Sequence, residues 1–167
     1  MRKVRAVSAW LSTLFFLFAL ASLGTSAQTT STPEERAQWV DTTHKLETVP
    51  LDDNVNKEGD AALKRLSDVH DIHVPLCPPL LNEFSGMKYT YSHAITRQCM
   101  LASGTFIIEN PGKSGDTKAM NLAAVESVLK TYQSILQQRP DAKAKALDDL
   151  LKKQSQGKLE DSLKQCP

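Results

Sequence analysis

The segment 92–110 constrains the fold of this chain more than any other, because it is apolar around most of its circumference when drawn as a helix. One face carries four residues at helical spacing: Ile95, Cys99, Ala102 and Phe106. Other apolar side chains, including Leu101, cover much of the remaining surface. A helix that is apolar nearly all round belongs in the centre of a bundle. We therefore predict that this helix forms the middle of a helical domain.

The next segment, 117–139, shows helical periodicity over a longer stretch. Its apolar residues recur at alternating steps of three and four, at Leu122, Val125, Leu129, Tyr132 and Leu136. Asp116 can cap the start of this helix, and Pro140 stops it. Because both segments carry long apolar stripes, we predict that the two helices pack together and form the core.

Shorter helices are predicted before and after this pair. Thr32, Pro33 and Glu35 supply a capping residue, a proline at the first helical position and the partner of a capping box. The predicted ranges are 32–47, 52–69, 80–85, 141–157 and 159–166. The weak alternation at 87–91 has no second strand to pair with. The prediction is an all-α domain over residues 32–167, a single bundle of five or six helices with short Pro/Gly connections.

The N-terminal residues 1–27 are typical of a cleaved signal peptide. Basic residues precede an apolar run over 9–23, and small residues then lead to Ala27. A retained membrane anchor is the alternative, but the run is shorter than the roughly 20 apolar residues of a spanning helix. We expect cleavage after Ala27, a flexible N-terminus over 28–31, and an exported protein, periplasmic or secreted, with no membrane span after cleavage.

The charge of the chain argues against one class of partner. The full sequence holds 20 Lys+Arg and 19 Asp+Glu, and the leader contains three of the basic residues, which leaves 17 against 19. Nucleic-acid binding requires a basic stripe, so we predict no nucleic-acid partner. A slightly acidic protein also gains no attraction to an anionic membrane surface.

The cysteines are expected to form one disulfide, since an exported chain meets an oxidising compartment. Cys99 lies in the apolar stripe of the central helix, where a cysteine behaves as a small buried hydrophobic residue. Cys77 and Cys166 lie in a connecting loop and at the C-terminal end, where the chain can move to join them. We predict a Cys77–Cys166 bridge and a buried free thiol at Cys99. The alternatives are a pairing that involves Cys99 and three free thiols.

Four histidines raise the question of a metal site. His70 and His73 lie three residues apart with two aspartates nearby, but the sequence around His73 is extended and need not place both rings on one face. His44 and His93 show no spacing typical of metal ligands. We therefore predict solvated loop histidines, with no metal and no cofactor.

The sequence also lacks the common signatures of catalysis. It contains no Gly-x-Ser-x-Gly elbow, no HExxH motif and no phosphate-binding glycine loop. The small residues at 102–105 lie inside the most apolar helix, where such residues permit close helix packing. We predict no catalytic residues, and a hydrolase with an unrecognised active site is the alternative.

Several segments resemble a set of small exported bacterial proteins that have no assigned activity. These segments are 69–77, 88–91, 106–111 and 122–140. The resemblance implies an exported helical protein and brings no catalytic signature with it. It also implies one cysteine at the position of Cys77 and another near the C-terminus, without a regular one at Cys99.

These observations favour a binding or structural module that works in the periplasm or outside the cell. Its partner would be a protein or a small ligand of that compartment. A small disulfide-tied bundle suits such a role by analogy of form.

Overall fold

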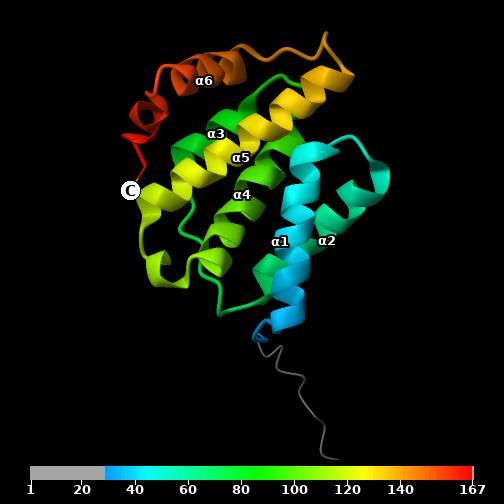
Figure 1. Ribbon diagram of the computed structural model, residues 1–167, viewed down its shortest axis with the longest axis vertical. Helices are drawn as coiled ribbons and strands as arrows, with labels where there is room; N and C mark the ends of the chain where they lie inside the picture. Colours follow the sequence, from blue (N-terminus) through cyan, green and yellow to red (C-terminus); the bar gives the residue numbers. More distant parts are fainter. Residues whose placement is uncertain (1–28, 167) are drawn as a thin grey trace, which may run out of the picture.

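The computed structural model describes residues 29–166, and their helices form one bundle (Figure 1). The α-helices are α1 (Pro33–Thr48), α2 (Asp53–Asp68), α3 (Pro78–Gly86), α4 (Ser92–Glu109), α5 (Thr117–Gln138) and α6 (Lys145–Ser155). Two short 3-10 helices are η1 (Pro111–Lys113) and η2 (Leu159–Leu163). The all-α prediction is confirmed. The signal peptide predicted over 1–27 lies outside the described residues.

The predicted pairing of α4 with α5 forms the centre of the bundle. In Figure 1 these two helices lie side by side, with α1 and α2 against one side and α6 on the opposite side. Ile95, Cys99 and Ala102 are buried along α4, as predicted. Phe106 was expected on the same buried face but is only half-buried, because it lines a surface cavity. Within residues 29–166, no helix is both long and apolar enough to cross a bilayer.

The start of α1 follows the local sequence closely. The Thr32 hydroxyl accepts a hydrogen bond from the Glu35 backbone N–H at 3.2 Å, and Glu35 accepts one from the Thr32 N–H at 2.8 Å. This is the predicted capping box. The buried face of α1 consists of Trp39, Thr42, Thr43 and Leu46, and Val40 beside it is half-buried.

Two glycines allow the helices around α4 to approach closely. A Cβ atom at Gly104 of α4 would lie 3.0 Å from the Trp39 ring of α1. A Cβ atom at Gly59 of α2 would lie 2.8 Å from Leu46 Cδ1 and 3.1 Å from Arg97 Nε. The prediction that small residues within 102–105 permit close packing is therefore confirmed at Gly104.

The residues that precede α1 are held against the C-terminal end of α2. Thr29 forms an isolated parallel bridge with Val69. The Ser31 N–H and hydroxyl donate to the two carboxylate oxygens of Asp71 at 3.0 and 2.7 Å. These contacts involve residues 29–31 of the segment 28–31, which the sequence predicts to be flexible, and that prediction stays untested. The first residue of that segment lies outside the described part of the chain.

The C-terminal helix begins later than predicted. The sequence predicts a start at Asp141, whereas α6 begins at Lys145. The reason is a tertiary contact that the local sequence does not show. The Tyr132 hydroxyl accepts a hydrogen bond from the Ala144 N–H at 2.9 Å and donates to Asp148 at 2.8 Å. This pair of hydrogen bonds fixes the first turn of α6 against α5.

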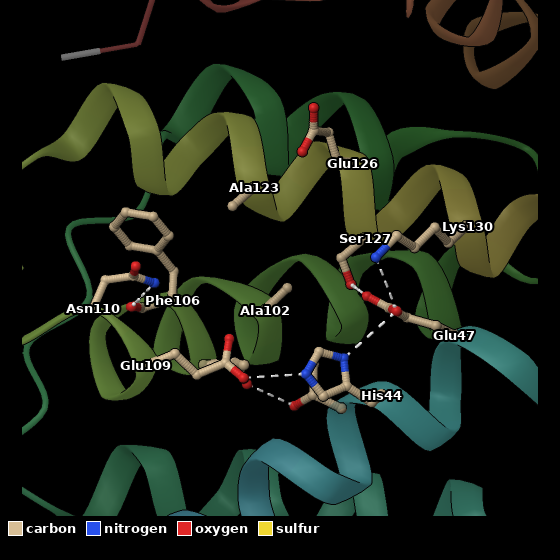
Figure 2. A pocket seen from close by; sticks show the side chains of 12 residues that line it. His44, Glu47, Ala102, Phe106, Glu109, Asn110, Ala123, Glu126, Ser127 and Lys130 are labelled. Carbon is tan, nitrogen blue, oxygen red and sulfur yellow. Dashed lines mark hydrogen bonds and ion pairs between the residues drawn. The ribbon is translucent and has the colours of Figure 1, made fainter. Parts of the chain in front are cut away.

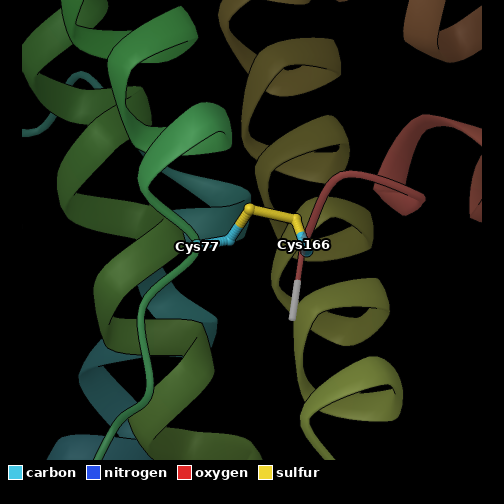
Figure 3. The surroundings of a disulfide bond; sticks show 2 residues. All are labelled: Cys77 and Cys166. Atoms are coloured by element: carbon cyan, nitrogen blue, oxygen red, sulfur yellow. A yellow bond between two sulfur atoms is a disulfide. The ribbon is translucent and has the colours of Figure 1, made fainter.

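A disulfide joins the start of α3 to the end of the chain (Figure 3). The Cys77 and Cys166 sulfur atoms are 2.08 Å apart, and the two Cα atoms are 5.2 Å apart. Cys99 is free and buried on α4. Burial raises the pKa of its thiol to about 12. This geometry agrees with the pairing expected from the sequence and with a thiol that packs as a hydrophobic group.

Candidate functional site

A cavity of about 210 Å³ opens where α1, α4 and α5 meet (Figure 2). Helix α1 contributes Thr43, His44 and Glu47 to its lining. Helix α4 and the residue after it contribute Ala102, Thr105, Phe106, Glu109 and Asn110. Helix α5 contributes Ala123, Glu126, Ser127 and Lys130. Three helices with polar residues facing one space therefore define the candidate site.

Glu47 is the centre of the polar contacts in this cavity. Its side chain is only 11% exposed, and its two oxygens have different partners. One oxygen accepts a hydrogen bond from the Ser127 hydroxyl at 2.6 Å. The other lies 3.2 Å from the Lys130 ammonium and 3.6 Å from His44 Nδ1. These contacts fix the position of the carboxylate at the wall of the cavity.

Gln98 holds Ser127 in position on the side away from the cavity. It is 1% exposed on α4, and its amide nitrogen donates to Ser127 Oγ at 2.7 Å and to the Thr43 carbonyl oxygen at 3.0 Å. Because Ser127 accepts from Gln98, its own hydrogen is directed to Glu47. The chain of hydrogen bonds thus ties α4 to α5 and α1 through side chains that are removed from water.

His44 connects two helices across the opening of the cavity. Its ring is half-exposed, and Nε2 lies 3.3 Å from Glu109 of α4 while Nδ1 faces Glu47 of α1. Figure 2 shows the ring between these two carboxylates. A neutral imidazole carries one N–H and can donate to one of them, whereas the imidazolium can donate to both.

Buried hydroxyl groups complete the lining between α1 and α4. Thr105 donates to Thr43 Oγ1 at 2.9 Å, and Thr43 donates to the Trp39 carbonyl oxygen at 2.9 Å. Both threonines are almost fully buried. Since each hydroxyl hydrogen is already committed, neither threonine offers a donor to the cavity.

The contacts of Ser127 do not match those of an activated nucleophile. Such a serine donates its hydrogen to an imidazole, which a third group orients. Ser127 donates to Glu47 instead, and among the described residues no hydrogen bond joins it to His44. Its exposure is 5%, so a substrate has little access to the oxygen. The arrangement favours the binding of a ligand over nucleophilic attack.

The remaining histidines lie apart from this cavity. His70 and His73 are exposed and follow α2, and His93 on α4 lies 3.2 Å from Asp60. The part of the chain that the structure describes holds no group of three or more His, Cys, Asp or Glu side chains placed to bind a metal ion. The structure thus brings only one of the four histidines, His44, into the candidate site.

No pattern in the sequence predicts this site. His44 and His93 were expected to be solvated loop histidines, whereas their side chains extend from α1 and α4. The one signal in the sequence is that Gln98 and Ser127 are polar residues among the apolar positions of two core helices. Buried polar side chains require partners, and only the structure identifies Glu47 as the partner of Ser127.

Comparisons with protein-family models, with curated proteins and with solved structures returned no match. The resemblance to small exported bacterial proteins therefore stays a prediction. The function of the cavity has to be inferred from its own side chains and their contacts.

Proposed function

We propose that this protein is an exported binding module, and that it holds a small polar ligand in the cavity between α1, α4 and α5. The observation that carries the proposal is the network around Glu47, in which Ser127, Lys130 and His44 hold one carboxylate against the cavity. Binding sites of this kind combine a fixed shape with a few oriented polar groups. The buried Gln98 supplies that fixation.

The proposed compartment rests on the leader sequence and on the disulfide. A Cys77–Cys166 bridge persists in an oxidising compartment and is uncommon in the cytosol. N-terminal sequencing of the protein from the exported fraction should give a chain that begins at Gln28. A full-length chain retained in the cytoplasm would refute this part of the proposal.

The binding site can be tested with ¹H–¹⁵N correlation spectra of the exported protein during titration with small polar probes. Cationic, anionic and neutral probes should be compared, and at least one should shift resonances of the cavity lining. Ala123→Leu should abolish these shifts, because the larger side chain fills the space between α4 and α5. Ala37→Leu changes an exposed position of α1 outside the cavity and is the matched control.

Two outcomes would count against the proposed function. One is that no probe of any charge shifts the lining residues. The other is that Ala123→Leu binds as well as the parent while its spectrum remains that of the folded protein.

A hydrolase is the second candidate, favoured by the 2.6 Å contact between Ser127 and a carboxylate that could accept its proton. A screen of ester and amide substrates on the folded protein tests it. Turnover that disappears in Ser127→Ala, with the cavity shape kept, would favour hydrolysis over binding alone.

A further inference from the structure

We propose that the ligand of this cavity is a small organic ammonium ion, a primary amine with a short apolar stem. This inference rests on the proposed function, because it specifies the chemical class that the same cavity takes. Charge, hydrogen-bonding capacity, the shape of the wall and the size of the space all point to this class.

The charged groups of the lining leave negative charge without a partner. Three carboxylates line the cavity, from Glu47, Glu109 and Glu126, against one ammonium group, that of Lys130. Lys130 is engaged with Glu47, at 3.2 Å. Glu109 contacts only the ring of His44, and Glu126 forms no ion pair within residues 29–166. A ligand that brings one positive charge would therefore improve the electrostatic balance.

The uncharged groups of the lining include one acceptor without a donor. The amide nitrogen of Asn110 gives one of its two hydrogens to the Phe106 carbonyl oxygen at 3.0 Å, and within residues 29–166 its side-chain oxygen accepts no hydrogen bond. Thr105 has given its hydrogen to Thr43 and therefore offers no donor. An ammonium group has three donors and no acceptor, and it is the complement of such a lining.

An apolar wall lies beside these acceptors. Figure 2 shows the Phe106 ring at the end of the cavity opposite Glu47 and Lys130, with Ala102 and Ala123 between the two ends. The face of an aromatic ring attracts a cation and packs against methylene groups. This wall gives the half-buried Phe106 a role that helix packing alone does not explain.

The size of the cavity limits the ligand. A volume of about 210 Å³ accommodates an alkylammonium ion of a few carbon atoms. It is at the small end of ligand pockets, so it suits a small ligand. A bare divalent cation is disfavoured, because the described residues present no suitable group of ligands.

The test compares three probes of one shape on the exported protein with its disulfide intact: n-butylammonium, butyrate and butanamide. Calorimetry or ¹H–¹⁵N spectra should show that butylammonium binds most tightly and shifts the lining residues. Glu109→Gln and Glu126→Gln should each weaken butylammonium binding about two- to five-fold, the value of one partly exposed charge contact. Glu83→Gln, an exposed carboxylate of α3 outside the cavity, should leave binding unchanged.

The outcomes separate this inference from the proposed function. If butyrate or butanamide binds in the cavity and butylammonium does not, the ammonium assignment is overturned while the binding site stands. If none of the three binds, both are overturned for ligands of this size. If butylammonium binds equally well to both glutamine variants and to the parent, the carboxylates do not recognise it and the inference fails.

Discussion

The two sides of α4 are built in different ways. Toward α3, α5 and α6 lies the C-terminal core, an apolar cluster whose members include Phe84, Leu129, Ile135 and Leu147, each fully buried. Toward α1 and α2 lies the N-terminal core, a smaller cluster of Trp39, Leu46, Val69, Ile72 and Leu101. Four buried side chains of α4 are polar or charged. Arg97, Gln98 and Thr105 donate hydrogen bonds toward α2 or α1, whereas Ser103 donates to the Cys99 carbonyl oxygen of its own helix. One helix therefore joins an apolar interior to a polar one.

Arg97 illustrates how buried polar contacts orient α2 on α4. The side chain is 2% exposed and donates to the Asn56 carbonyl oxygen at 3.1 Å and to Asp60 at 2.7 Å. Removing a guanidinium group from water is costly, and directional partners are needed to offset that cost. Such contacts specify how α2 lies on α4, whereas apolar area alone specifies it weakly. The candidate cavity lies where this polar side meets α5, and hydrogen bonds between α1, α4 and α5 line it.

The largest expected loss of stability follows from removing the disulfide of the C-terminal core. Cys166→Ser opens a bridge between residues separated by 89 positions. The loss of this constraint on the unfolded chain should lower the free energy of unfolding by up to about 4–5 kcal/mol. Thermal and denaturant unfolding under oxidising conditions measures it. In reduced protein, the variant and the parent should have nearly equal stability.

Cys99→Ala is the control for that result. Cys99 is buried without a crosslink, so the change removes packing and should cost about 1 kcal/mol under both redox conditions. Peptide mapping without reductant gives the decisive observation. Cys99 in any crosslinked fragment would contradict the assignment of the bridge.

The next effect tests how tightly the N-terminal core is packed. Gly59→Ala places a methyl group 2.8 Å from Leu46 Cδ1 and close to Arg97, and both of these side chains are buried. Overpacking costs about 1–3 kcal/mol, which should exceed the ~1 kcal/mol that alanine gains in a helix. Gly86→Ala on α3 meets no atom within 4 Å, so chemical denaturation should show no loss of stability there. Equal behaviour of the two variants would show that the N-terminal core is loosely packed.

The third prediction concerns the main polar contact of the C-terminal core. Tyr132→Phe keeps the ring but leaves the Ala144 N–H without its acceptor. An unsatisfied buried donor should cost about 1–2 kcal/mol, and the start of α6 should fray. Hydrogen exchange should report faster exchange at the first turn of α6 than in α5. Unchanged exchange there would mean that α6 does not depend on Tyr132.

The smallest effect is a pH dependence at the edge of the N-terminal core. Burial opposes the ionisation of Asp71, but hydrogen bonds from Ser31 and Arg36 outweigh it and hold the pKa of this carboxyl well below its usual range. The unfolded chain, in which an Asp has a pKa of about 3.9, therefore takes up the proton first as pH falls. The stabilisation is complete above the unfolded value and is lost as pH falls from there toward the folded value.

Asp71→Asn should remove this part of the acid sensitivity. Its stability should be lower than that of the parent at neutral pH, and the difference should shrink as pH falls below about 4. Unfolding curves measured across the acidic range provide the comparison. Asp68→Asn, which removes an exposed partner of Lys64, is the matched control and should keep the parent's slope.

The fold could be predicted where local chemistry decides it. The capping box at Thr32, the cap at Asp116 and the apolar stripes of α4 and α5 depend on neighbours within a few residues. The start of α6 could not be predicted, because it depends on a hydroxyl of Tyr132 that is distant in sequence. The contacts of residues 29–31 with Asp71 depend in the same way on packing between separate segments.

The candidate site could not be predicted for a related reason. Glu47, Glu109 and Ser127 belong to three helices, and no spacing in the sequence indicates that they meet. Glu47 and Glu109 each fall near a helix end, where a carboxylate is ordinarily solvated. Only the crossing of α1 over the α4–α5 pair makes them neighbours. Helix crossing geometry depends on small residues such as Gly104, whose effect is seen only after assembly.

The disulfide between Cys77 and Cys166 also determines which fragments stay covalently linked after a protease cuts the chain once. It closes α3, α4, α5, α6 and η2 into a covalent ring, while α1 and α2 form a linear arm outside it. One cut within the ring leaves a single molecule, and fragments appear only after reduction. One cut within the arm frees an N-terminal piece at once, and a cut after α1 carries away His44 and Glu47. A single cut can therefore break the covalent link only between the arm and the rest, and the arm includes the helix that carries His44 and Glu47.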